Sequence, residues 1–289
     1  MRIYIMTDLE GVAGVQQSID WCYTDGRYYH KAKEFLTMET NAAIEGFIEA
    51  GADEFLVADG DGAGGIDQLL LNPKIEYVCS WPAGEASFSL TDGKFDFAAW
   101  VGQHPMAGTI GGHISHTGNM GVVEQSINGI PVGEFGDLVF LATELGIRTI
   151  LGTGCEAFCR EAQALLPGIE TVAVKKGTQT EPGNHLSKDA YRKHNISAIH
   201  LSPEEARIRI KEGARRALER AKKEDFGLAK LPQPPYTKIR ITRADGENPP
   251  RILRQTHPSS LLEMRRASIS VEVMPINPAD PAIRKVSGR

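Results

Sequence analysis

The sequence lacks any hydrophobic run that approaches the length of a membrane span, which is about 18 residues or more. Its first apolar stretch is only a few residues long and is interrupted by Asp8 and Glu10, unlike a signal peptide. It also lacks a basic excess, with 32 Lys and Arg against 37 Asp and Glu and a net charge of −5. Nucleic-acid-binding proteins usually carry a basic face. Neither a membrane nor a nucleic acid is therefore an expected partner.

Cysteine is scarce, and its spacing is irregular. Cys22, Cys79, Cys155 and Cys159 contain no CxxC pair and no regular framework. In a chain of this length they indicate reduced thiols, which predicts a cytoplasmic location. Cys155 and Cys159 lie four positions apart, so they could form a metal pair on one helix face. Two small residues facing the core are the favoured interpretation.

With 41% hydrophobic and 24% charged residues, the chain has the composition of a folded globular protein. Strand and helix patterns alternate as far as about residue 175, which predicts an α/β fold, with a three-layer sheet core and helices on both faces. We expect this core at 1–185 and a smaller α+β part at 186–289. The expected strands are 2–7, 54–58, 75–79, 95–101, 149–152, 171–174, 236–242 and 267–273, with a hairpin at 122–132. The expected helices are 31–50, 133–145, 155–166 and 202–223, with short helices after Gly65 and at 259–263 and a polar turn after residue 242.

Potential metal ligands follow the predicted strands at their carboxyl ends, where open α/β sheets bind ligands. They are Asp8 and Glu10 after the first strand, Asp59 and Asp61 after the second, His104 after the strand at 95–101, and Glu134 after the hairpin. Residues 8 and 10 would project to the same side of an extended strand end. A single acidic residue in such a place is usually a solvated charge. The recurrence at successive strand ends favours a metal site.

Three histidines lie in the segment HPMAGTIGGHISH, namely His104, His113 and His116. Imidazole is both a common metal ligand and the usual general acid or base near neutral pH. His104 directly follows a strand and should be rigidly placed. Of the two in the Gly-rich loop, one is a catalytic candidate, and for His113 we keep the interpretation of a polar loop residue.

Residues 60–65 fit the dinucleotide-binding pattern G-x-G-x-x-G after a strand. Asp59, Asp61 and Asp67 would repel a pyrophosphate, and Pro73 cuts short any helix that follows. Nucleotide binding is therefore disfavoured. A Ser-His-Asp hydrolase is disfavoured as well, because the G-x-S-x-G turn is missing.

Several motifs, taken in order, resemble the D-aminopeptidase family of the dipeptide-permease operon type. They are IYIMTDLEGVAGV at the N-terminus, Gly102-Gln103-His104, Ser115-His116 and Pro131-Val132-Gly133-Glu134, with Ala173-Val174-Lys175 and Leu201-Ser202-Pro203 also fitting. The resemblance covers most of the chain, to about residue 225. It implies a zinc aminopeptidase with two adjacent metal ions, built as a ring-like homo-oligomer such as a decamer. It also implies metal ligands at Asp8, Glu10, His104 and Glu134 and a catalytic histidine at His116.

One position departs from the family pattern. The family has a metal-binding histidine in an Asp-Ser-His segment after the second strand, and Asp61 stands at that position here. The second ion would then be held by Asp8, Glu10 and Asp61 alone. Oxygen ligands suit hard cations better than zinc. We therefore expect zinc with His104 and Glu134, and a second site where Mn or Co could be preferred.

The sequence thus predicts an enzyme, a metal-dependent aminopeptidase that hydrolyses the N-terminal amide bond of short peptides, with a D-residue at the N-terminus as one option. His116 would shuttle protons, donate to the transition state or attack directly. Two alternatives stay open: a non-catalytic protein that binds metal or a small molecule, and a metal-dependent hydrolase of another amide or ester.

Overall fold

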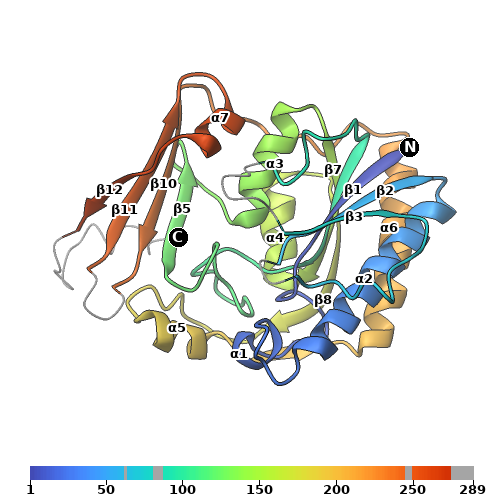
Figure 1. Ribbon diagram of the computed structural model, residues 1–289, viewed down its shortest axis with the longest axis horizontal. Helices are drawn as coiled ribbons and strands as arrows, with labels where there is room; N and C mark the ends of the chain where they lie inside the picture. Colours follow the sequence, from blue (N-terminus) through green and yellow to red (C-terminus); the bar gives the residue numbers. More distant parts are fainter. Residues whose placement is uncertain (62–63, 81–86, 245–248, 275–289) are drawn as a thin grey trace.

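A seven-stranded sheet forms the centre of the protein (Figure 1). The structure, a computed structural model, describes residues 1–61, 64–80, 87–244 and 249–274. In spatial order the strands are β3 (Glu76–Val78), β2 (Glu54–Asp59), β1 (Arg2–Thr7), β4 (Phe97–Gln103), β7 (Arg148–Cys155), β8 (Glu170–Gly177) and β9 (Ala198–His200). Neighbouring strands are parallel except for β8 and β9, which are antiparallel. The carboxyl ends of β1, β2, β4, β7 and β8 therefore meet at one edge.

Helices cover both faces of this sheet. They are α2 (Tyr29–Glu49) and α6 (Pro203–Ala221) on one face, and α3 (Glu134–Glu144) and α4 (Glu156–Leu165) on the other. Alternate residues of β1 enter the two cores, since Ile3 and Ile5 pack with the first pair and Tyr4 with the second. This arrangement confirms the predicted α/β fold.

Helix α6 begins where the sequence predicts it. The Ser202 hydroxyl accepts a hydrogen bond from the Glu205 amide at 3.2 Å, and Pro203 occupies the first turn. Its buried side is rich in alanine, which allows close packing against α2. At the tightest point, a Cβ on Gly46 would lie 2.1 Å from the Lys211 carbonyl oxygen. The two helices therefore form one tight layer beneath the sheet.

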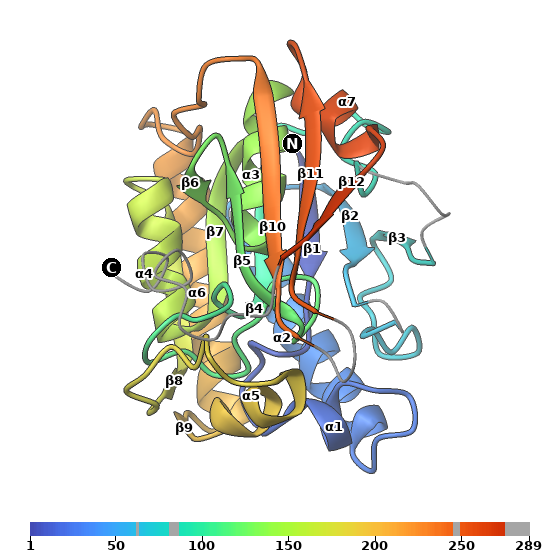
Figure 2. The ribbon, with the colours of Figure 1, turned by 90° about the vertical axis from the view of Figure 1, so that its left-hand side faces the viewer.

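A second sheet lies beyond α3 and α4 and faces the viewer in Figure 2. Its antiparallel strands, in order, are β12 (Ser270–Val273), β11 (Arg251–His257), β10 (Tyr236–Thr242), β5 (Val122–Ile127) and β6 (Ile130–Pro131). The predicted hairpin joins β5 to β6, with positive φ at Asn128 (48°) and Gly129 (80°). The sheet combines strands from both sides of residue 185, and that proposed boundary stays a prediction.

Several short elements were not predicted. They are α1 (Ser18–Trp21), α5 (Lys188–His194), β9 and β11. The prediction of a polar turn after β10 extended too far along the chain. Residues 251–257 instead form strand β11, which pairs with most of β10. The helix expected after Gly65 was also wrong, since residues 68–70 form a turn. Helix α7 (Leu261–Arg266) and the strand near the C-terminus are confirmed.

Two sequence features fall partly or wholly outside the described residues. Residues 62 and 63 of the Gly-rich pattern at 60–65 are among them, and so is the segment after residue 274. Among the residues that the structure does describe, no helix combines the length and apolar character needed to cross a bilayer.

A buried ion cluster connects the second sheet to helix α3, which covers the first sheet. Asp137 of α3 contacts Lys238 of β10 at 2.6 Å and Arg265 of α7 at 2.5 Å. All three side chains are at most 10% exposed. Burial alone would raise the pKa of Asp137, but Arg265 and Lys238 outweigh it and hold this pKa well below its usual value. The carboxylate is therefore the shared counter-ion that attaches the second sheet to α3.

Replacement of Asp137 by alanine should destabilise the fold by about 3–5 kcal/mol, because it removes the buried carboxylate that both Lys238 and Arg265 contact. The native contribution should be present above the unfolded pKa of about 3.9 and be lost as the pH falls through the depressed native value. Urea unfolding at several pH values measures both effects. Glu263→Gln, which removes an exposed ion pair on α7, is the control and should change stability little. Equal stability of the Asp137 variant and the wild type would contradict the prediction.

Candidate metal centre

Asp8 and His104 lie side by side because the strands that precede them are neighbours. β1 and β4 pair in parallel, with Thr7 opposite Val101, and the Asp8 amide donates to the Val101 carbonyl at 3.0 Å. The His104 Nε2 atom lies 3.2 Å from Asp8 Oδ2. The Gln103 side-chain amide donates to the same oxygen at 2.9 Å. The sheet register thus places an imidazole and an amide on one carboxylate.

The close approach of these two strand ends depends on glycine. Gly102 has a φ of +79°, and a Cβ at this position would lie 2.0 Å from the Asp8 carbonyl oxygen. Any other residue would therefore clash with the backbone of the segment that carries Asp8 and Glu10. The motif Gly102-Gln103-His104 thus combines a tight backbone contact, an orienting amide and a ligand.

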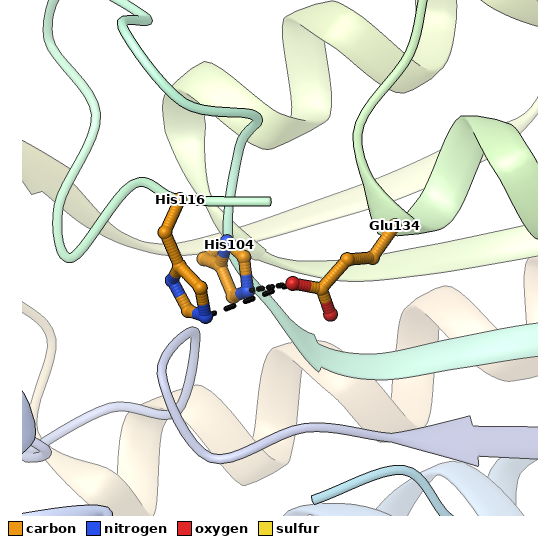
Figure 3. A group of neighbouring side chains, drawn as sticks. All are labelled: His104, His116 and Glu134. Carbon is orange, nitrogen blue, oxygen red and sulfur yellow. Dashed lines mark ion pairs between the residues drawn. The ribbon is translucent and has the colours of Figure 1, made fainter. Parts of the chain in front are cut away.

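Glu134 reaches the same place from the other side. It is the first residue of α3, directly after the β5–β6 hairpin. Its Oε1 atom accepts a hydrogen bond from the Gly118 amide at 2.6 Å and lies 3.6 Å from Nε2 of both His104 and His116. The positive end of the helix dipole favours a carboxylate here. Figure 3 shows the Glu134 side chain directed at the two imidazoles.

The predicted site residues form two overlapping groups. Asp8, Glu10 and His104 make one group, and His104, His116 and Glu134 make the other; within each, the ligand atoms lie within 4.8 Å of one another. The His104 and His116 rings stack with centroids 3.9 Å apart and 14° between their planes. His104 belongs to both groups and therefore stands at the centre of the site.

The charges of this site call for a cation at its centre. The His104 Nδ1 atom lies 3.0 Å from the Pro105 carbonyl, which can only accept, so Nδ1 carries a proton and Nε2 faces the two carboxylates. Burial would lower the pKa of His104, but Asp8 and Glu134 outweigh it and raise the pKa well above its usual value. In the protein alone a second proton supplies the positive charge. A divalent cation bound by the same atoms would supply it instead, so the donor set fits a metal.

The closely placed carboxyl groups of Asp8 and Glu10 also fit a metal site. Asp8 and Glu10 are both at least nine-tenths buried. Burial, and then the neighbouring Asp8, raise the pKa of Glu10 to about 8. Glu10 therefore keeps its proton near neutral pH in the metal-free protein, and a bound cation would stabilise its carboxylate form instead.

His116 is held by an unusual backbone. Its Nδ1 atom donates to the Ile114 carbonyl at 2.9 Å, so Nε2 carries the free lone pair and faces Glu134. Ile114 has a φ of +51°, which is strained for a β-branched residue. Asn195 holds this turn on both sides, since its carbonyl accepts from the Ile114 amide and its side-chain amide donates to the Ser115 carbonyl, both at 2.8 Å. Burial, and then His104, lower the pKa of His116.

Other residues singled out in the sequence lie outside the two groups. Asp61 is half-buried and joins neither, although it acts electrostatically on Cys22, as Glu10 does. Asp59 accepts hydrogen bonds from the amides of Gly65 and Ile66 and supports the loop. His113 lies in a loop, as expected, and its side chain is fully buried. Among the described residues, Cys155 and Cys159 are buried free thiols and belong to neither metal group.

Comparisons with known proteins identify the family of this chain. The family model described as D-aminopeptidase matches residues 1–248. The chain belongs to the D-aminopeptidase family. A curated D-aminopeptidase of Bacillus subtilis (strain 168) is 29% identical over 185 residues, which is 61% of this chain and 64% of that relative. The aligned part thus spans less than two thirds of the relative's length.

A solved member of the D-aminopeptidase family shares the fold. The Zn-dependent D-aminopeptidase DppA from Bacillus subtilis, described as a self-compartmentalizing protease, superimposes with a TM-score of 0.75. The superposition covers 92% of this chain and 94% of that one, at 21% sequence identity. The two chains therefore share one fold over most of their length.

Proposed function

We propose that this chain is a metal-dependent aminopeptidase that removes the N-terminal residue of short peptides, in particular a D-residue. The observation that carries the proposal is the convergence of Asp8, Glu10, His104, His116 and Glu134 on one edge of the sheet. Membership in the D-aminopeptidase family supports the reaction class, and the names of the relatives support a D-residue at the N-terminus.

Two metal ions, with zinc the first choice, would be held by the chain's own residues. His104 and Glu134 would hold one, and Asp8, Glu10 and Asp61 would hold the second. When bound, such ions polarise a carbonyl and lower the pKa of water toward neutrality. The Gln103 amide keeps Asp8 in place, and the Gly118 amide and the helix N-terminus do the same for Glu134.

His116 would move the proton. Its neutral form has Nδ1 bonded to the Ile114 carbonyl, so Nε2 can accept a proton on the side of Glu134 and deliver it to the leaving amine. The lowered pKa of His116 keeps this nitrogen free near neutral pH. Stacking against His104 limits rotation of the ring.

The proposed function is tested on the purified protein with D-alanyl and L-alanyl amides and dipeptides. We expect hydrolysis of the D-alanyl compounds, loss of activity after chelation, and recovery when Zn, Mn or Co is added back. A metal-loaded protein that cleaves no peptide would indicate a non-catalytic binding protein. Cleavage of other amides or esters but not of peptides would indicate a hydrolase of different specificity.

Asp61 should make the second site a weak zinc site. With Asp8, Glu10 and Asp61 as ligands the second ion has no nitrogen donor, and carboxylate oxygens favour harder cations than zinc. Calorimetric titration of the metal-free protein should therefore give one tight and one weaker, exchangeable zinc. Asp61→His should tighten the weaker site, whereas the control Asp61→Asn should not. Two equally tight zinc sites that do not respond to Asp61→His would show that Asp61 is not a ligand.

The chain should assemble into a ring-like homo-oligomer such as a decamer. The reason is its family membership together with the self-compartmentalizing relative. Exposed apolar side chains are available for contacts between subunits, among them Ile19, Tyr23 and Tyr28 near α1. Light scattering should give a mass several times 31.5 kDa, and a monomeric mass would contradict the prediction. We also propose that it acts in the cytoplasm, where its four free cysteines would stay reduced.

A further inference from the structure

Four consecutive residues after the Asp8–Glu10 pair are each held by a side chain from another part of the chain. The bonds are Ala13 amide to Glu39 Oε1 at 2.9 Å, Gly14 amide to His200 Nδ1 at 3.1 Å, Val15 carbonyl to Lys175 Nζ at 3.1 Å, and Gln16 carbonyl to His113 Nε2 at 3.0 Å. We call Glu39, His113, Lys175 and His200 the loop clamp. Its members come from α2, the histidine loop, β8 and β9. The conformation of segment 13–16 is therefore set by tertiary contacts.

The clamp is needed most at Ala13 and Val15, which are shielded from water, whereas Gly14 is half-buried and Gln16 is exposed. Val12, Ala13 and Val15 are fully buried. Buried backbone amides and carbonyls require partners, and an irregular segment cannot supply them from a regular ladder. The side chains of the loop clamp supply them instead. Loss of one member would leave a buried backbone group unpaired unless the segment moved.

The protonation of each clamp residue follows from its partner. His113 Nε2 faces two carbonyl oxygens, those of Gln16 and Ile196, so it carries the proton. His200 accepts from an amide, so its Nδ1 is unprotonated. Burial lowers the pKa of His113 to about 2 and that of His200 to about 4, and both rings are neutral. Lys175 is 3% exposed, and burial lowers its pKa to about 8, so it carries a buried positive charge at neutral pH.

The clamped segment is continuous with the metal ligands. Glu10 lies three positions before Ala13, and the Gly11 amide between them is fixed to the Gly102 carbonyl at 2.6 Å. Lys175 also interacts electrostatically with Glu10. Loss of the bond between Lys175 and the Val15 carbonyl would therefore affect the Glu10 carboxylate in two ways. The backbone between residues 10 and 15 could shift, and the positive charge of Lys175 could move away from Glu10.

We propose that Lys175 is a positioning residue of the metal centre: by holding the Val15 carbonyl within the loop clamp, it fixes Asp8 and Glu10 where they bind metal. The inference rests on the proposed function, because it presupposes a metal at these carboxylates. It gives a role to the motif Ala173-Val174-Lys175. Removal of such supporting groups typically weakens metal binding by about 10–100-fold.

The test compares Lys175→Met with Lys238→Met, each of which removes one buried lysine from a strand. Zinc affinity of the metal-free proteins is measured by competition with a chromophoric chelator, and ligand geometry by the absorption spectrum of the cobalt form. Lys175→Met should weaken binding at one site about 10–100-fold and change the cobalt spectrum. Lys238→Met should bind like the wild type, because Lys238 contacts Asp137 and not the clamped segment. Wild-type affinity and spectrum in Lys175→Met would overturn the proposal.

A second pair of variants keeps the test decisive if Lys175→Met does not fold. His200 is half-buried on β9, at the sheet edge. His200→Ala removes the acceptor for the Gly14 amide and should weaken zinc binding about 10-fold, whereas His200→Asn offers an oxygen in place of Nδ1 and should restore most of it. No difference between these variants would overturn the clamp. Wild-type protein that binds no metal at all would instead refute the proposed function.

Discussion

Replacement of Asp8 by alanine is expected to remove metal from the second site and to lower peptide hydrolysis by about 10³-fold, the scale on which loss of electrostatic stabilisation acts. Asp8 contacts His104 and accepts from Gln103, and it belongs to the group that contains Glu10. Elemental analysis and turnover of one preparation measure both losses.

The metal-free Asp8→Ala protein should still unfold cooperatively. The substitution removes the contacts of Asp8 with His104 and Gln103, and it also removes the neighbouring charge that raises the pKa of Glu10. Urea unfolding without metal therefore separates loss of a ligand from loss of the fold. Asp53→Ala, at the start of the segment that leads into β2 and far from the carboxyl edge, is the control with the same change of charge. Two metals per subunit in Asp8→Ala would show that the site is misplaced.

His116→Ala is expected to lower the turnover number by about 10²-fold or more while metal content stays near that of the wild type. The reason is that His116 Nε2 lies 3.6 Å from one carboxylate, that of Glu134, whereas His104 lies near the carboxylates of both Asp8 and Glu134. Its melting temperature should change little, because two hydrogen bonds from Asn195 still hold the strained turn at Ile114 when the bond from the imidazole is lost.

The matched control for His116 is His185→Ala, which removes an exposed histidine from a loop. It should keep wild-type turnover. If His116→Ala turned over substrate at the wild-type rate, its catalytic role would be wrong. If it lost metal together with activity, His116 would be a ligand, as its place beside His104 and Glu134 also allows.

The sequence predicted the sheet core well because the relevant signals are local. The buried strands β1 and β4 are short apolar runs, and α6 carries its own cap at Ser202. The hairpin at Asn128-Gly129 is likewise encoded by its turn residues. β11 was missed because its polar, half-exposed sequence forms a strand only by pairing with β10.

The candidate site also contains residues that the sequence could predict and residues that it could not. Residues directly after strands, such as Asp8 and His104, could be predicted because parallel strand ends converge. Their supporting residues could not. Nothing in the sequence near Lys175 or Asn195 indicates that one bonds to Val15 and the other to Ser115, since both contacts join distant segments. The burial of His113 within its loop could not be predicted for the same reason, because it depends on partners elsewhere in the chain.

The overlapping groups around His104 also have a consequence for folding. Asp8, His104 and Glu134 come from distant segments, and Glu134 follows a hairpin whose strands belong to the second sheet. The ligands can meet only after β1 has paired with β4 and the hairpin has docked, which are non-local events that form slowly. Metal uptake during refolding should therefore follow the last assembly step and not early collapse. Metal binding would then indicate that folding is complete, because a chain that has formed only its local helices and hairpin has not yet assembled this site.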